Sequence, residues 1–343
     1  MISVVVSVYE RPRLLDLCLA GLALQESAGE FEVVIADDGS LGEVRERVDH
    51  WTRVGAYPLR HARQERSGFR LAAARNTALR VARGDRIVFL DGDCVPPPHF
   101  LCLHREHSRA GVLLCGARVL LEEEETIRLP AGEAGARSAL KLTRGWRRGR
   151  LLARRLTDRV ERLLRLKERP KPLGANLSAT RDDVWAVNGF DERYKGWGFE
   201  DEDFARRLAR VGVWREFAPL AASVAHLWHP RDPTLTGRAS TSWNAARYHS
   251  DMGLTRPRRG IEFRSLEMVD VRVGGTAPPH LVHLLRELWP RAFDPSPGRE
   301  VTLAFFGTSP ASFLQHGENV VMIDPAISAG SPRSFREFLD QIV

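Results

Sequence analysis

Two pairs of aspartates in the first hundred residues have the spacing of ligands at the end of a β-strand. Asp91 and Asp93 flank a glycine after one apolar run, and Asp37 and Asp38 directly follow another. Residues i and i+2 of a strand point the same way, so Asp91 and Asp93 can face one ligand. Two carboxylates suit a divalent cation that is bound to phosphate oxygens, such as Mg²⁺ or Mn²⁺ in a nucleotide site. The alternative for both pairs is an ordinary polar turn.

A second acidic group consists of Glu200, Asp201, Glu202 and Asp203, directly after Gly196-Trp197-Gly198-Phe199. Carboxylates at a helix start interact favourably with the helix dipole, which explains them without any catalysis. However, a tryptophan between two glycines is a good mobile platform for a sugar ring. One of the acids beside it, partly desolvated, can serve as a general base.

Two histidines, His226 and His229, follow this acidic group. A single histidine is usually structural. Here one of them can complete a metal site begun by Asp93, and an imidazole ligand favours Mn²⁺ over Mg²⁺.

Alternating strand and helix signals must position these residues. The apolar runs predict three strands, and two Leu- or Ala-rich runs predict helices between them; the strands are 2–8, 31–36 and 86–90, and the helices 13–25 and 71–83. This order implies an α/β fold with a parallel sheet, in which ligands bind beyond the carboxyl ends of the strands. Both aspartate pairs lie at such ends. Arg75, on the second helix, can reach a diphosphate there, although a helical arginine is more often simply solvated.

The charge of the chain is concentrated in one segment. The 343 residues carry a net charge of +7, and residues 137–171 alone have 14 Lys and Arg against 3 acids, a local +11, so the remainder is −4. This segment predicts a basic amphipathic helical insertion at about 130–172, with Leu152, Leu156, Val160, Leu163 and Leu164 at helical spacing. It can lie on an anionic membrane or be a solvated helix against an acidic partner. A nucleic-acid-binding protein is disfavoured, because the segment has one aromatic residue, Trp146, and no readout motif.

Other features narrow the class of protein. The sequence has no run of about 18 apolar residues and no secretory signal, so we expect no membrane span and no export. Its four cysteines form no CxxC pair, which favours the cytoplasm. We place a domain boundary near residue 235, with 1–235 as the main domain and 236–343 as a C-terminal extension of unknown role, in which 301–306 and 319–323 look like strands.

Together the motifs resemble those of family 2 glycosyltransferases. The N-terminal half carries Ile2–Tyr9, Asp37-Asp38-Gly39-Ser40, Ala74-Arg75-Asn76 and Asp91-Gly92-Asp93. Further motifs are similar to the acceptor half of β-1,4-galactosyltransferase-like and chondroitin-polymerase-like enzymes: Gly174-Ala175-Asn176, Val187–Glu192 and Gly196–Asp201. The resemblance covers about residues 1–230. It implies a GT-A fold, a nucleotide-sugar donor (UDP-sugar first), a Mn²⁺ or Mg²⁺ cofactor, a glycan or lipid-linked acceptor, and inversion at the anomeric carbon.

The resemblance also implies roles for individual residues. Asp37 and Asp38 would lie at the uracil and ribose end, with Arg75 near the diphosphate. Asp91 would contact ribose or the metal's water shell, Asp93 would bind the metal, and His226 matches the third metal ligand best, with His229 as its rival. Asp201 would be the catalytic base and Glu200 would hold an acceptor hydroxyl, while Asn176 and Trp197 would contact acceptor or sugar.

One departure from the family pattern and two rival functions remain. Phe199 stands where the galactosyltransferase pattern often has glycine, which leaves donor and acceptor preference open. A Rossmann oxidoreductase is disfavoured, because no GxGxxG follows the first strand. A nucleotidyltransferase acting on sugar phosphates is the nearest enzymatic rival, since it shares metal carboxylates and a nucleotide crevice.

Overall fold

A computed structural model describes the chain through most of its first 262 residues. The described residues are 1–144, 147, 149, 152–153, 171–230, 243–249, 255–257 and 259–262, with the backbone of strands at 269–274, 299–305 and 319–323. Of the leucines in the predicted basic helix, only Leu152 is among them, so that prediction lies outside the described residues.

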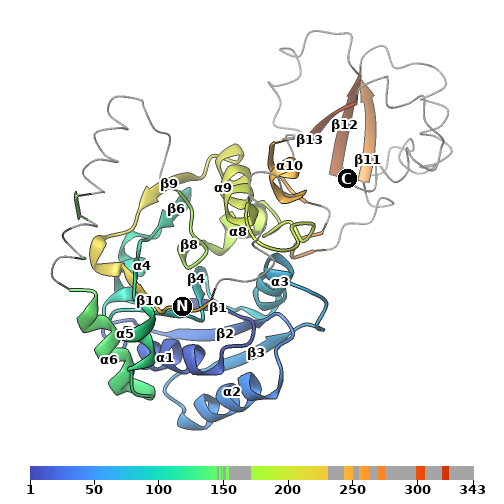
Figure 1. Cartoon of the computed structure of the whole chain (residues 1–343). Coiled ribbons are helices and arrows are strands. Elements are labelled where there is room, and N and C mark those ends of the chain that lie inside the picture. Colours follow the sequence, from blue (N-terminus) through green and yellow to red (C-terminus); the bar gives the residue numbers. More distant parts are fainter. Residues whose placement is uncertain are drawn as a thin grey trace.

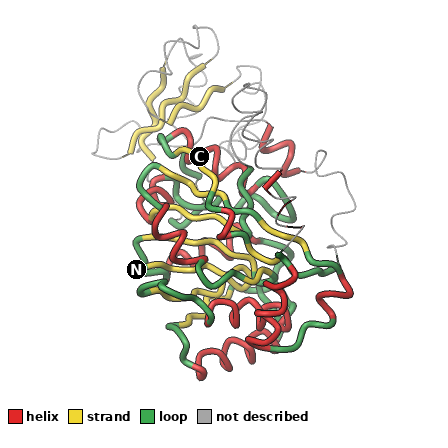
Figure 2. Tube along the Cα trace, turned by 90° about the vertical axis from the view of Figure 1, so that its left-hand side faces the viewer, coloured by secondary structure: helices red, strands yellow, loops and turns green. Residues whose placement is uncertain are grey.

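The core of the domain is a seven-stranded sheet in the order β3-β2-β1-β4-β8-β6-β9. Its strands are β1 (Ile2–Val8), β2 (Phe31–Asp37), β3 (Leu59–Arg63), β4 (Arg86–Asp91), β6 (Val112–Cys115), β8 (Asn176–Thr180) and β9 (Trp214–Phe217). Only β8 runs antiparallel to its neighbours. The predicted mixed, mostly parallel α/β sheet is therefore confirmed, and Figure 2 shows its strands side by side through the domain.

Helices cover both faces of this sheet. Every residue of β1 is buried, as expected for a central parallel strand. Val4 and Val6 pack with one group of helices and Val5 with another, because successive side chains of a strand alternate between faces. The first group is α1 (Pro12–Ala23), α2 (Gly42–Val54), α4 (Phe100–His107) and α6 (Gly132–Leu142), and the second is α3 (Leu71–Val81), α8 (Arg181–Ala186) and α9 (Glu200–Arg210). Figure 1 shows α1 and α6 side by side.

The register of the parallel strands brings the acidic residues to one edge. Asp91 pairs with Ser7 of β1, and Asp37 pairs with Val8 on the other side of β1. Three adjacent strands therefore end together, as the sequence predicts.

A small second sheet continues this edge. It has the order β5-β10-β7, formed by β5 (Cys94–Val95), β10 (Val224–His226) and β7 (Arg118–Leu120). β10 pairs antiparallel with β5, which sets His226 opposite Cys94. The short helix α5 (Glu123–Ile127) and the 3-10 turn η1 (Leu220–Ala222) flank it in the sequence.

The structure extends the main domain beyond the boundary that we expect near residue 235. Helix α10 (Trp243–His249) and residues 255–257 and 259–262 pack on it, and Ile261 is part of its buried core. Arg80 donates to the carbonyl oxygens of Gly260 and Ile261, at 2.7 Å each. These residues belong with the main domain.

The extension contains one further described sheet. β11 (Val269–Gly274), β12 (Arg299–Phe305) and β13 (Asn319–Ile323) are parallel neighbours, so the two strands that the sequence predicts here are confirmed. Among the described helices, none is long and apolar enough to span a membrane.

Candidate functional site

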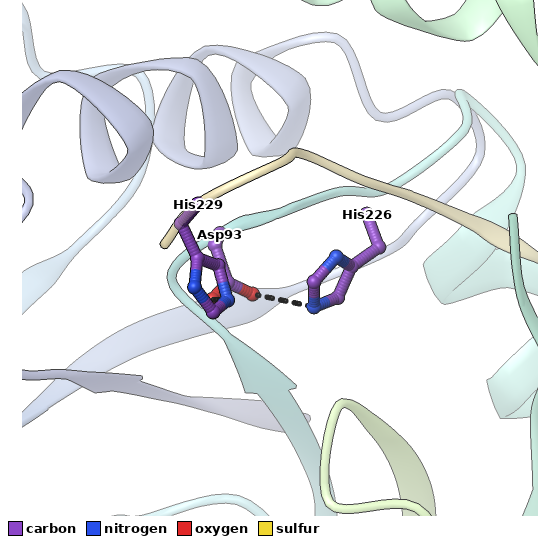
Figure 3. Close-up of side chains that lie close together, drawn as sticks. All are labelled: Asp93, His226 and His229. Carbon is purple, nitrogen blue, oxygen red and sulfur yellow. Dashed lines mark ion pairs between the residues drawn. The ribbon is translucent and has the colours of Figure 1, made fainter. Parts of the chain in front are cut away.

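Asp93, His226 and His229 converge beside the carboxyl end of β4. The Nε2 atom of His229 lies 3.1 Å from Asp93 Oδ2, and that of His226 lies 3.6 Å from Asp93 Oδ1. One potential ligand atom from each residue lies within 4.8 Å of the others. Figure 3 shows both imidazoles facing the carboxylate. The structure therefore brings both histidines to Asp93, where the sequence analysis weighed them as rivals.

Backbone contacts hold the two histidines in this arrangement. The N–H of Leu227 donates to the carbonyl of Asp93 at 2.9 Å. The N–H of Trp228 donates to the hydroxyl of Thr126 at 2.9 Å, which fixes the chain between the imidazoles. Thr126 is in turn held by Arg13, whose Nη2 donates to its carbonyl at 3.0 Å.

The charges around Asp93 favour its ionised form. Burial opposes ionisation, but the hydrogen bond from His229 and the positive charges of the imidazoles and Arg11 outweigh it and lower the pKa of Asp93 to about 2. Burial lowers the pKa of His226, whereas the hydrogen bond to Asp93 raises that of His229. One carboxylate with two imidazoles is a donor set that suits Mn²⁺, so these three residues fit a divalent cation.

Arg75 lies at the centre of the site and joins its two acidic groups. Its guanidinium is 1% exposed, and its Nη1 donates to Asp201 Oδ1 at 2.7 Å. Its Nη2 lies 3.4 Å from Asp91 Oδ1, and its Nη1 lies 3.9 Å from Glu200 Oε1. The guanidinium also lies 5.0 Å from the ring centre of Phe190. Arg75 thus neutralises a carboxylate of the N-terminal half, Asp91, and one of the acceptor half, Asp201. Its contact with a diphosphate remains a prediction.

Gly174 makes the closest approach to this ion pair. Its N–H donates to Asp201 Oδ2 at 2.7 Å, so both oxygens of Asp201 are held. A Cβ at Gly174 would lie 2.0 Å from Arg75 Nη2, so only glycine fits here.

We expect Arg75→Met to destabilise the protein strongly. The change leaves the carboxylates of Asp91 and Asp201 without their buried cation, at a cost of about 3–5 kcal/mol in the free energy of unfolding. Denaturant unfolding measures it. The control is Arg109→Met, because Arg109 pairs with Glu216 at the surface and such pairs contribute about 0–1 kcal/mol. Equal losses in the two variants would contradict the central role of Arg75.

Glu200 is buried beside this pair and keeps a proton near neutral pH. Burial first, and then the negative charge of Asp201, raise its pKa to about 8. Burial likewise raises the pKa of Asp91, to about 6. Among the described residues, Oε2 of Glu200 is buried and has no hydrogen-bond partner.

The raised pKa of Glu200 predicts a pH dependence of stability. Between the ordinary value of 4.5 and about 8, the folded state holds a proton that the unfolded state has lost, so the free energy of unfolding falls as pH rises through this window. Glu200→Gln removes this contribution, and we expect its melting temperature to fall less than that of the wild type between pH 5 and pH 8. Parallel melting curves would contradict the assignment.

Asp37 and Asp38 lie at the same edge of the sheet, but both side chains are buried. Asp37 bonds His61 at 2.7 Å and the N–H of Ser40 at 2.8 Å; these bonds outweigh the effect of burial and lower its pKa. Asp38 accepts from Gln64 and from the N–H of Arg70, and burial raises its pKa. The structure gives both aspartates a part in shaping the loop after β2, and their contact with a nucleotide remains a prediction.

Trp197 and Asn176 have opposite surroundings. The side chain of Trp197 is 52% exposed, as a platform for a sugar ring requires. Asn176 is buried, and both of its amide protons are used, by the carbonyls of Ala117 and Ala222. Its oxygen faces Nε2 of His104 at 3.0 Å. These bonds hold Asn176 in the interior of the protein, and its contact with the acceptor remains a prediction.

Arg11 and α10 also contribute to the site, and the sequence analysis assigns them no role. Arg11 Nη1 lies 3.4 Å from Asp93 Oδ2. Asn244 of α10 donates to the carbonyl of Gly198 at 3.0 Å. Arg11 comes shortly after the first predicted strand, so the sequence places it near the carboxyl end of that strand. No sequence pattern places α10 in the same way.

Comparisons with known proteins show which families and relatives the chain is similar to. The family model described as glycosyl transferase family 2 matches residues 3–159, and the model described as N-terminal domain of galactosyltransferase matches residues 160–230. Chondroitin synthase of Escherichia coli is 27% identical over 67% of this chain and 35% of its own length. Validoxylamine A glucosyltransferase of Streptomyces hygroscopicus subsp. limoneus is 31% identical over 62% of this chain and 49% of its own length. The chain thus spans half or less of these relatives.

Solved structures provide a further comparison. A mannosyltransferase from Pyrobaculum calidifontis, in complex with GDP-Man and Mn²⁺, has a TM-score of 0.47 and 19% identity, covering 67% of this chain and 57% of that one. TarS of S. aureus, in complex with UDP-GlcNAc, has a TM-score of 0.48 and 16% identity, covering 74% and 65%. The two family models together match residues 3–230, so this part of the chain is similar to family 2 glycosyltransferases over residues 3–159 and to the N-terminal domain of galactosyltransferases over residues 160–230.

Proposed function

We propose that the protein transfers a sugar, with inversion, from a nucleoside-diphosphate donor to a hydroxyl of a glycan or lipid-linked acceptor. The observation that carries this proposal is the buried Arg75, which joins Asp91 at the end of β4 to Asp201 at the start of α9. Asp93, which lies with His226 and His229, follows the first of these aspartates by two residues, and the exposed Trp197 precedes the second by four. The names of the relatives, which include chondroitin synthase and a glucosyltransferase, support sugar transfer, and UDP-sugars are the first donors to test.

Asp93, His226 and His229 would hold a divalent cation, with Mn²⁺ preferred over Mg²⁺ because two of the three donors are imidazoles. When bound, such a cation supplies a positive charge that stabilises the leaving diphosphate. Asp91 would contact the ribose or the water around the cation. Asp37, Asp38 and Arg75 would form the rest of the donor side.

Asp201 is the base in this proposal. It removes the proton of the acceptor hydroxyl as the oxygen attacks the anomeric carbon from the face opposite the diphosphate, in a single displacement. Arg75 and the N–H of Gly174 orient its carboxylate. Glu200, protonated near neutral pH, donates its proton in a hydrogen bond to an acceptor oxygen, and Trp197 stacks on the sugar ring.

A screen of nucleotide sugars tests this function. The protein is incubated with Mn²⁺ and with UDP-glucose, UDP-galactose, UDP-N-acetylglucosamine, UDP-N-acetylgalactosamine, UDP-glucuronate or GDP-mannose, with and without saccharide acceptors. We expect nucleoside diphosphate to be released from one of these donors and to increase with acceptor. Release of pyrophosphate from sugar phosphate and UTP would instead indicate a nucleotidyltransferase.

We also propose that the enzyme works in the cytoplasm at the inner face of the membrane. The support is the local charge of +11 over residues 137–171, which attracts anionic lipid. Flotation with vesicles of phosphatidylglycerol and phosphatidylcholine at low salt tests it. Retention that is lost at high salt is expected, and no retention at low salt would refute it.

A further inference from the structure

The loop from Gly196 to Phe199 has an unusual backbone directly before the two carboxylates of the acceptor side. Gly196, Gly198 and Phe199 have φ angles of +75°, +98° and +70°. A left-handed conformation is unfavourable for a residue with a side chain, so Phe199 needs support from its surroundings. Phe199 is also the N-cap residue directly before helix α9. Its backbone therefore sets the positions from which Glu200 and Asp201 extend.

Helix α10 supplies this support. Nδ2 of Asn244, which is 2% exposed, lies 3.0 Å from the carbonyl oxygen of Gly198 and 3.4 Å from that of Trp197. The ring of Phe199 packs against Tyr248, with 5.1 Å between ring centres. The amide of Asn244 must present its nitrogen here, because the opposite orientation would set its oxygen against two carbonyl oxygens.

The same helix is tied to α9 beyond the loop. Arg206 of α9 donates to the carbonyl of Tyr248 at 2.7 Å, and its guanidinium lies 3.9 Å from the centre of that ring. Thus α10 contacts the chain on both sides of Glu200 and Asp201. The family models end at residue 230, so α10 lies outside the part of the chain that they match.

We propose that α10 is a latch, that is, a helix that holds the acceptor site in place. Asn244 and Tyr248 are positioning residues, and they hold Trp197 and Phe199. Through these two residues they keep Glu200 and Asp201 in the arrangement that receives the acceptor saccharide. This inference rests on the proposed function for its effect on transfer. It also explains why a phenylalanine occupies a position that suits glycine. The ring of Phe199 gains a packing partner on α10 that glycine would lack.

Hydrogen–deuterium exchange of the full chain tests the latch without any substrate. In Asn244→Ala and in Tyr248→Ala, we expect the amides of residues 197–203 to exchange about 5–10-fold faster, which corresponds to the loss of about one hydrogen bond. The amides of β4 keep their protection. The controls are Ala246→Gln, on the exposed face of the same helix, and Tyr248→Phe, which retains the ring; both should exchange like the wild type. Unchanged exchange in Asn244→Ala and Tyr248→Ala overturns the proposal.

Kinetics then separates positioning from general structural damage. With a donor found in the screen, Asn244→Ala should raise the KM for the acceptor several-fold and lower kcat, while binding of UDP with Mn²⁺ is unchanged. An equal loss of donor and acceptor binding overturns the latch. If the wild type shows no glycosyl transfer, the proposed function fails, and the exchange experiment still decides on the latch.

Discussion

Asp201→Asn is expected to lower the rate of sugar transfer by about 10²–10⁴-fold, the usual contribution of a general base. Asparagine has nearly the same shape, and its amide oxygen can still accept a hydrogen bond from Arg75 or from Gly174. It cannot remove a proton from the acceptor hydroxyl at neutral pH. The loss should appear in kcat for the acceptor reaction, while the affinity for UDP with Mn²⁺ stays near that of the wild type.

Nucleoside diphosphate release and calorimetric titration with UDP measure these two quantities. The matched control is Glu202→Gln, one position along α9, since Glu202 pairs with Lys171 at 3.0 Å near the surface. Thermal melting of both variants accounts for the ion pair with Arg75 that Asp201→Asn weakens. Full transfer activity in Asp201→Asn would remove Asp201 from the role of base.

Much of the donor side can be predicted from sequence because local pattern and topology agree there. An apolar run followed by two acids specifies a strand end, and parallel connections bring such ends to one edge of a sheet. Asp37 and Asp91 illustrate this, since both lie at the ends of strands that pair with β1. The spacing of His226 and His229 also indicates that both can reach one centre. The family resemblance favours His226 as the third metal ligand, whereas the structure brings both histidines to Asp93.

Other parts of the site depend on contacts that no local pattern reveals. Asn176 lies in a motif of the acceptor half, but the direction of its side chain is set by two carbonyls far away in sequence, those of Ala117 and Ala222. Arg75 has the sequence context of an ordinary helical arginine. Its burial depends on α9, more than a hundred residues later.

Helix α10 shows a third limit. It has seven residues, which is two turns, and it follows a stretch rich in proline, glycine and arginine, so no hydrophobic period indicates it. Its stability comes from tertiary contacts such as those of Asn244 and Tyr248, as is common for short helices. A boundary placed from composition alone therefore falls before residues that the main domain needs.

The net charge of +7 is not a property of the site. The charged groups at the site are mostly carboxylates: Asp91 and Asp201 lie against the buried guanidinium of Arg75, and Asp93 follows Asp91 by two residues. A diphosphate brought to this edge would meet repulsion unless another positive charge were present. The acidity of the site is thus a physical reason to expect that a divalent cation is required.

Asp93→Asn is expected to prevent binding of the divalent cation. We expect the rate of transfer to fall on the order of 10³-fold or more, because several kcal/mol of stabilisation of the leaving diphosphate depend on the cation. Asparagine preserves the shape of the side chain and removes the only carboxylate of the cluster. Mn²⁺ binding to the free protein, followed by electron paramagnetic resonance, should weaken strongly. The matched control is Asp85→Asn, since Asp85 is a surface residue beside the start of the same strand and pairs with the N-terminus.

Loss of either histidine should also weaken the binding of Mn²⁺. We expect His226→Ala and His229→Ala each to weaken Mn²⁺ binding by about 10–100-fold, as the loss of a group that holds or orients a metal does. His107→Ala is the control, because His107 is exposed on α4 and bonds only to its own helix in the described part of the chain. If one histidine variant binds Mn²⁺ like the wild type, the site has a single imidazole ligand. Transfer that continues in EDTA, with Asp93→Asn as active as the wild type, would show that Asp93, His226 and His229 hold no catalytic cation. In that case Arg75 and Arg11 alone would neutralise the diphosphate.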